Sequence, residues 1–384
     1  MNVHDFRIDV PAVVIEDLRD RLRGTRWPDQ VEGVGWGQGT EREFLREVVA
    51  HWGHNFDWFA VQDRLNHCAQ RLVEVSGGLR VHVVHERGEV EGGQPIVLLH
   101  GWPSSFVQML PIMPMLTQPS RYGGSAGDAF DAVALSLPGY GFSDRPTDAG
   151  WDLRRIADAV VEVMEALGYT TFAGRGSDLG AGVLQQLALA YPDRLVGLHL
   201  SGTNPYLGWV PDDLTPEEQS FVEAAQDWNA REMAYAQEHS SKPQTLAHAL
   251  NDSPAGLASW VLEKFRAWSD CDGDLRNVYD LDDLLTNLTV YWVTETIGSS
   301  MRLYWEAARS TNAAYGRVEV PTGMAMSDKD MFPTPRAWAE RSYRLTRWTK
   351  LQRGGHFLEW ETPEPLAEDI RVFFRELRTA RLEG

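Results

Sequence analysis

The sequence predicts an α/β fold in which a mostly parallel sheet is flanked by helices. Short continuous apolar runs lie at residues 95–99, 132–137, 170–173 and 195–200, and such runs are typical of strands buried on both faces. Between them lie segments such as 154–167, whose apolar residues recur at helical spacing. Alternating strands and helices of this kind indicate a parallel sheet covered on both faces.

Interruptions of this alternation divide the chain into four parts. Residues 1–79 are rich in tryptophan and helical patterns, and we expect them to form an N-terminal helical extension. Residues 80–205 form the first part of the core, beginning with an alternating strand pattern. Residues 206–314 contain one helical segment after another and are expected to form a lid. The strand pattern then resumes, so residues 315–384 form the second part of the core.

The composition excludes several classes of function. Hydrophobic residues make up 43% of the 384 residues, and the net charge of −19 repels phosphate backbones and anionic lipids. Neither nucleic acid nor a membrane is therefore an expected partner. The sequence contains no run of 18 apolar residues, so it predicts no membrane-spanning helix. Only Cys68 and Cys271 are present, too few for a disulfide framework or a multi-cysteine zinc site. With a polar N-terminus, the chain is expected to be cytoplasmic and to need no cofactor or metal.

A glycine-rich turn follows the predicted strand at 170–173 and precedes a helix, which is the context of a nucleophile elbow. Such an elbow needs small residues two positions before and after the nucleophile. For Ser177 those positions hold arginine and leucine, whereas for Asp178 they hold Gly176 and Gly180. Asp178 is therefore the predicted nucleophile. A phosphate-binding turn is the alternative, but the aspartate would repel phosphate and no lysine follows it.

Two loops are predicted to supply the groups that stabilise and assist this nucleophile. His100-Gly101-Trp102-Pro103 follows the first apolar core strand, where α/β-hydrolases place one oxyanion-hole donor, and the residue after the nucleophile provides the other. The expected donors are the backbone N–H groups of Trp102 and Leu179. Near the C-terminus, His356 follows two glycines and is the expected general base, because the order nucleophile, acid, histidine is that of this fold.

The acid that orients the histidine is expected in the loop after the strand at 318–320. Asp328 and Asp330 both lie in this loop, and their spacing alone does not separate them.

With these motifs the chain resembles the microsomal-type epoxide hydrolases of the α/β-hydrolase superfamily over nearly its whole length, including the N-terminal segment. The motifs that carry the resemblance lie at residues 99–103, 137–143, 250–254, 284–287, 320–323 and 353–357. The resemblance implies that Asp330 is the charge-relay acid, although most animal members have glutamate there. It also implies two lid acids, Tyr235 before Lys242-Pro243 and Tyr304 after Met301-Arg302-Leu303. Leu179 is a second departure, because many relatives have tryptophan after the nucleophile.

The implied activity is the hydrolysis of an epoxide to a vicinal diol. Asp178 would open the ring to form an alkyl-enzyme ester, the lid tyrosines would protonate the ring oxygen, and water activated by His356 would cleave the ester. A serine nucleophile would instead form an ether, which water does not readily cleave. The expected small-molecule partner is a bulky aryl or alkyl epoxide, including intermediates of secondary metabolism, since the chain loosely resembles soluble bacterial members of enediyne antibiotic pathways.

Three other functions compete with this interpretation. A haloalkane dehalogenase shares the aspartate elbow, but Leu179 removes the usual tryptophan beside the nucleophile. A serine esterase would need Ser177 in a sterically poor position, and a non-catalytic binding module would not need the complete set of Asp178, Asp330 and His356. The sequence does not determine the oligomeric state, for which a homodimer is one expectation.

Overall fold

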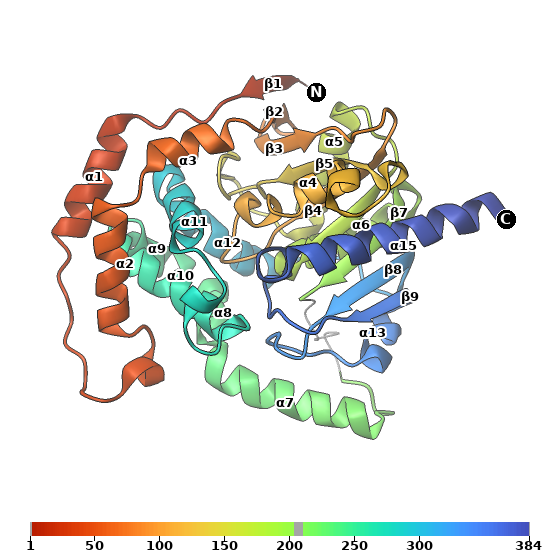
Figure 1. Cartoon of the computed structure of the whole chain (residues 1–384). Coiled ribbons are helices and arrows are strands. Elements are labelled where there is room, and N and C mark those ends of the chain that lie inside the picture. The colour runs from red at the N-terminus through yellow and green to blue at the C-terminus, as the bar shows by residue number, and fades with distance from the viewer. Residues whose placement is uncertain (1, 203–209, 384) are drawn as a thin grey trace.

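A nine-stranded sheet forms the centre of the computed structural model, which describes residues 2–202 and 210–383 (Figure 1). The strands are β1 (Val3–Phe6), β2 (Gln70–Glu74), β3 (Arg80–Glu86), β4 (Gln94–Leu99), β5 (Phe130–Leu135), β6 (Phe172–Ser177), β7 (Leu195–Ser201), β8 (Val318–Met326) and β9 (Tyr343–Lys350). Their order is β1-β2-β3-β5-β4-β6-β7-β8-β9; the pairs from β1 to β5 are antiparallel, and those from β5 onward are parallel. The predicted α/β fold with a mostly parallel sheet is confirmed.

Helices cover both faces of this sheet. On one face lie α4 (Met113–Thr117) and α15 (Pro363–Glu383), which crosses the sheet in front in Figure 1. On the other lie α5 (Leu153–Ala166) and α6 (Asp178–Ala190), and α6 contacts β4, β6, β7 and β8. The central strands are therefore buried on both sides, which explains why they are continuous apolar runs.

Strand β6 is longer than the apolar run at 170–173 predicted, because it continues through Gly174 and Gly176 to Ser177. These glycines allow α6 to approach the strand closely. A Cβ atom added to Gly174 would lie 2.8 Å from a methyl carbon of Leu184, and one on Gly176 would lie 2.9 Å from another. Residues that look like a turn in the sequence are therefore a strand packed tightly beneath a helix.

The N-terminal segment contains α1 (Ala12–Arg23), α2 (Arg42–His54) and α3 (Trp58–Leu65), in agreement with the expected helical extension. It also supplies β1 and β2, which extend the antiparallel edge of the sheet. Strand β1 has only four residues, too few for an alternating pattern to be recognised in the sequence. The helices of this segment contact α10 and α11, so the segment joins the edge of the sheet to helices that come much later in the chain.

Among the residues described between β7 and β8, six α-helices form the helical insertion: α7 (Pro216–Glu232), α8 (Ala234–Ser241), α9 (Pro243–Leu250), α10 (Pro254–Trp268), α11 (Leu281–Thr294) and α12 (Ile297–Ala307). The predicted boundary at residues 205 and 206 lies outside the described residues. Helix α7 passes along the β9 end of the sheet (Figure 1), where Phe221 contacts Trp338 and Arg341 donates a 2.5 Å hydrogen bond to Glu218. Within the described ranges, no helix is long and apolar enough to cross a membrane.

Candidate active site

Asp178 stands at the sharp turn between β6 and α6, where the backbone is strained. Its φ angle is +52°, in the left-handed region that side chains other than glycine seldom adopt. The preceding residue, Ser177, has an ordinary extended conformation with φ −132°. The strained position expected of a nucleophile elbow is therefore occupied by Asp178 and not by Ser177.

Glycines let three backbone segments meet at this turn. A Cβ atom on Gly176 would lie 2.9 Å from the carbonyl of Gly180, and one on Gly180 would lie 2.2 Å from the carbonyl oxygen of Leu99. A Cβ atom on Gly101 would lie 2.3 Å from the Cβ of Asp178. The two glycines that the spacing argument placed around the elbow are thus sterically required, and Gly101 is a third.

The carboxylate of Asp178 is held asymmetrically. The backbone N–H of Trp102 donates a 2.9 Å hydrogen bond to Oδ1. Leu179 is the second residue of α6, so its N–H has no carbonyl partner within its own helix. Oδ2 lies on the other side, 3.5 Å from Nε2 of His356. The Asp178 side chain is 16% exposed, against 4% for Asp330, so of these two carboxylates Asp178 is the more accessible.

His356 lies between the two aspartates and is itself buried. Its Nδ1 is 2.8 Å from Oδ1 of Asp330, which also accepts a hydrogen bond from the N–H of Met331. The other candidate acid, Asp328, is exposed and forms an ion pair with Lys350 at 2.7 Å. The structure therefore brings together Asp178, His356 and Asp330, and it directs Asp328 elsewhere.

The charge of these aspartates controls the protonation of the histidine. Burial opposes the charged imidazolium, but the carboxylates of Asp330 and Asp178 outweigh it and raise the pKa of His356 to about 10. With both carboxylates ionised, the ring is an imidazolium at neutral pH.

Tyr235 on α8 and Tyr304 on α12 lie close to each other, with ring centroids 6.0 Å apart. Burial raises the pKa of both phenols, and the negative charge of Asp178 raises them further. The ring of Trp102 stacks on Tyr235 with centroids 5.1 Å apart and meets Tyr304 edge to face at 6.2 Å. Trp102, whose N–H binds Asp178, thus contacts both tyrosines of the insertion. The raised pKa values keep both phenols protonated.

Sequence reasoning missed two residues of this aromatic cluster, His239 and Trp268. The ring of His239 lies 4.7 Å from that of Trp102, and the ring of Trp268 lies 5.5 Å from that of His356. His239 follows Tyr235 by four residues on α8, so helical spacing could have placed both on one face. Trp268 ends α10, and nothing in its local pattern distinguishes it from a core residue.

A buried ion pair beneath the elbow was also missed. Arg175 on β6 donates a 2.7 Å hydrogen bond to Glu359, and both side chains are fully buried. Gln108 donates to the second carboxylate oxygen of Glu359 at 2.7 Å. Glu359 follows His356 by three residues, so this network joins the nucleophile strand to the histidine segment. Its partners are far apart in the sequence, which is why no local pattern reveals them.

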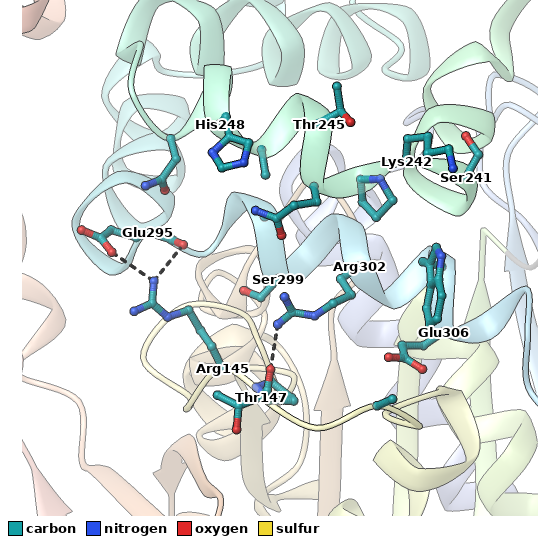
Figure 2. A pocket seen from close by; sticks show the side chains of 18 of the residues that line it. Arg145, Thr147, Ser241, Lys242, Thr245, His248, Glu295, Ser299, Arg302 and Glu306 are labelled. Atoms are coloured by element: carbon teal, nitrogen blue, oxygen red, sulfur yellow. Dashed lines mark hydrogen bonds and ion pairs between the residues drawn. The ribbon is translucent and has the colours of Figure 1, made fainter.

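A cavity with a volume of about 1000 Å³ lies elsewhere in the described part of the chain. Figure 2 shows Arg302 and Glu306 of α12 facing it, together with Arg145 and Lys242. Asp178, Asp330, His356 and both tyrosines are not among the residues that line it. Helix α12 therefore presents one side to this cavity and carries Tyr304 in the aromatic cluster.

No group of three or more histidine, cysteine, aspartate or glutamate side chains in the described part of the chain is arranged to bind a metal ion. What the site can do follows from its protein groups. It combines an accessible carboxylate, an N–H donor on one of its oxygens, a buried histidine with its own carboxylate partner, and two protonated phenols.

Comparison with known proteins gives a consistent result along the chain. Residues 3–109 match the family described as the epoxide hydrolase N terminus, and residues 94–292 match the α/β hydrolase fold family. A candidate epoxide hydrolase of Stigmatella aurantiaca is 40% identical over 97% of this chain and 85% of its own length. Epoxide hydrolase 1 of Sus scrofa is 31% identical over 97% of this chain and 88% of its own.

Solved structures agree with these matches. The juvenile hormone epoxide hydrolase of Bombyx mori superposes with a TM-score of 0.86 at 28% identity, covering 99% of this chain and 95% of that one. The epoxide hydrolase of Aspergillus niger gives a TM-score of 0.85 at 28% identity, covering 98% and 97%.

Proposed function

The chain belongs to the epoxide hydrolase family of the α/β-hydrolase fold and is an epoxide hydrolase, and we propose that it opens its substrate through a covalent ester of Asp178. The observation that carries the proposal is the asymmetric environment of this carboxylate. Oδ1 accepts the Trp102 N–H, whereas Oδ2 accepts no backbone hydrogen bond from the residues that the structure describes and faces His356. Oδ2 is therefore the oxygen that attacks.

In the first half-reaction, Oδ2 of Asp178 attacks a ring carbon and the carbon–oxygen bond of the epoxide breaks. Tyr235 and Tyr304 both hydrogen-bond the ring oxygen, and one of them transfers its proton to this oxygen and becomes a phenolate. Their raised pKa values keep both phenols protonated before the reaction. The product of this step is an ester between Asp178 and the substrate, carrying one new hydroxyl group.

In the second half-reaction, His356 removes a proton from water, which attacks the carboxyl carbon of Asp178. The charge that develops on Oδ1 is stabilised by the N–H of Trp102 and by that of Leu179. The carbon–oxygen bond of the ester breaks at the carboxyl carbon, and Oδ2 takes the proton from His356 and leaves with the diol. The oxygen from water remains on Asp178. Asp330 orients the histidine and stabilises its charged form.

Ester formation itself prepares the histidine to act as a base. Before the reaction, the charges of both aspartates hold the pKa of His356 at about 10, so the ring is protonated. Esterification removes the charge of Asp178 and leaves only that of Asp330. The pKa of His356 then falls. The imidazolium gives up its proton, which restores the phenolate to a phenol, and the neutral ring can then accept a proton from water. The base is thus activated only once there is an ester to hydrolyse.

The surroundings of Asp178 favour a substrate with an aryl or bulky apolar group. Trp102, Trp268 and Tyr235 form an aromatic wall on the side of the insertion, with ring centroids 5.1–6.1 Å apart. We infer that the insertion acts as a lid over the aspartate, and that the four parts delimited in the sequence correspond to extension, core, lid and core. A role in secondary metabolism, with an enediyne-type intermediate as substrate, is a narrower proposal that rests on the sequence resemblance.

A single turnover in water labelled with heavy oxygen tests the ester route. Enzyme in excess is mixed with styrene oxide, trans-stilbene oxide or 1,2-epoxyoctane, and the diol is analysed by mass spectrometry. Unlabelled diol is expected, because its new oxygen comes from Oδ2 of Asp178. Labelled diol from the first turnover would mean that water attacks the epoxide directly, and the assignment of Asp178 as nucleophile would be wrong.

A further inference from the structure

Glu361 makes an unusual set of contacts on either side of the candidate base. It is mostly buried at the end of α14 (Leu358–Glu361), five residues after His356. Its Oε2 accepts a 2.8 Å hydrogen bond from the N–H of Gly355, and its Oε1 accepts one of 2.9 Å from the N–H of Phe357. One carboxylate thus holds the backbone immediately before and immediately after His356.

The same carboxylate reaches the helical insertion. Oε2 of Glu361 also accepts a 2.7 Å hydrogen bond from the N–H of Asp270, just beyond the end of α10. Next to it, the N–H of His356 donates to the carbonyl oxygen of Trp268 at 2.8 Å. A Cβ atom on Gly355 would lie 2.4 Å from that same carbonyl oxygen, so the two segments are in direct backbone contact. Glu361 therefore links the loop that carries His356 to the segment of the insertion that follows α10.

From this geometry we propose that Glu361 is a positioning residue that fixes His356 for the hydrolysis of the ester and has little part in its formation. The proposal rests on the ester route through Asp178. Three backbone N–H groups converge on the carboxylate, and the ionised form, whose oxygens only accept, suits three donors better than the acid, which carries an O–H donor of its own. Burial raises the pKa of Glu361 to about 7, and the three N–H groups act against that rise. None of the groups that act in ester formation, Asp178, Trp102 N–H or the two tyrosines, is a hydrogen-bond partner of Glu361 among the described contacts.

The two half-reactions should therefore respond differently to the loss of this carboxylate. Glu361→Gln keeps the size of the side chain but replaces one acceptor oxygen with an NH2 group, which faces an N–H donor. At least one hydrogen bond to the loop is lost, and Nε2 of His356 is no longer held in line with water and the ester carbon. Ester formation depends on Asp178 and the phenols, and their contacts with Trp102 are unchanged.

Rapid-quench mass spectrometry of the whole protein measures both rates, using whichever of the three epoxides above the wild type turns over fastest. For E361Q we expect ester formation within twofold of wild type and ester hydrolysis about tenfold slower, so that the adduct accumulates. E364Q is the matched control, because it removes the same charge from an exposed side chain three residues further on. This variant should leave both rates unchanged.

Three results would overturn the proposal for Glu361: equal losses in both rates, unchanged hydrolysis, or the same effect in E364Q. If glutamine prevents folding, E361D provides the second measurement. It keeps the charge but is too short to reach all three N–H groups, and the same selective loss is expected. A wild type that forms no adduct and gives labelled diol from heavy-oxygen water would instead contradict the ester route itself, so the two failures are distinguishable.

Discussion

The core half and the insertion half of the site hold their reactive groups in different ways. Asp178 and the Trp102 N–H stand on loops at the ends of β6 and β4, and backbone contacts through Gly101, Gly176 and Gly180 fix their positions. Tyr235 and Tyr304 stand on helices and are fixed by ring contacts with Trp102 and with each other. The core half therefore has almost no freedom to move without breaking the sheet, whereas the insertion half can shift by changes in side-chain packing.

This difference suits the two tasks proposed for the halves. The nucleophile and the oxyanion donor must keep one geometry through both half-reactions, because the same carboxyl group is first nucleophile and then acyl group. The phenols act only while the epoxide ring opens. The insertion half that carries them must also admit the substrate and release the diol. These demands explain why one half is rigid and the other can repack. Variants in each half test this difference.

Removing the base should have the largest effect on turnover. His356→Gln deletes the group proposed to activate water, yet it leaves Asp178 and both tyrosines intact. Steady-state diol production should fall by at least about a thousandfold, while the ester still forms. Intact-mass spectrometry should show a stoichiometric adduct whose mass increase equals that of the epoxide. If the variant releases diol at the wild-type rate, His356 is not the base.

The next prediction tests whether backbone contact really fixes the core half. Gly180→Ala places a methyl group 2.2 Å from the Leu99 carbonyl oxygen, so β4 and α6 must separate and Asp178 must move. We expect a destabilisation of about 2 kcal/mol together with a loss of ester formation of at least tenfold. Thermal melting and the rapid-quench assay measure the two effects.

Gly182→Ala on the same helix is the matched control for that variant. Its added methyl group meets only the flexible end of Leu153 at 3.1 Å, so activity should be retained and stability should change by less than about 1 kcal/mol. Equal behaviour of the two alanine variants would show that the close approach at Gly180 is not what positions the nucleophile.

The insertion half should be easier to alter without loss of stability. Tyr235→Phe and Tyr304→Phe keep the ring contacts and remove one proton donor each. Each should slow ester formation by about tenfold to a hundredfold, and the double variant should be slower than either, because the two phenols share the ring oxygen. Hydrolysis of an ester that has already formed should be unchanged, and so should the melting temperature. A fall in hydrolysis would mean that the tyrosines also position His356.

The same difference explains how far the sequence could predict the site. The elbow, the Trp102 loop and His356 were predicted from local signals, because a close backbone approach demands glycines at fixed positions. Tyr235 and Tyr304 came only from the family resemblance, since a tyrosine on an amphipathic helix carries no local mark of its role. Ring packing tolerates many residue types, so the insertion half leaves a weaker pattern.

Contacts between distant segments were beyond local prediction. Spacing could not separate Asp330 from Asp328, and the choice of Asp330 came from the family resemblance. The fold shows that Asp330 reaches His356 while Asp328 pairs with Lys350. Two further contacts were missed from the sequence for the same reason. One is the ion pair of Arg175 with Glu359, and the other is the set of hydrogen bonds from the backbone around His356 to Glu361. Each depends on where the C-terminal segment returns to the sheet, and no short stretch of sequence determines that.

The smallest effect is expected at the residue beside the nucleophile. Ser177 is buried in an extended conformation at the end of β6, and Gln108 approaches its hydroxyl at only 3.5 Å. Ser177→Ala should therefore keep activity within about threefold of wild type and change stability by about 1 kcal/mol or less. Steady-state kinetics with the preferred epoxide and thermal melting check both. An inactive but folded variant would place the nucleophile at Ser177 and favour a serine esterase, because the strain at Asp178 would then serve only to present its neighbour.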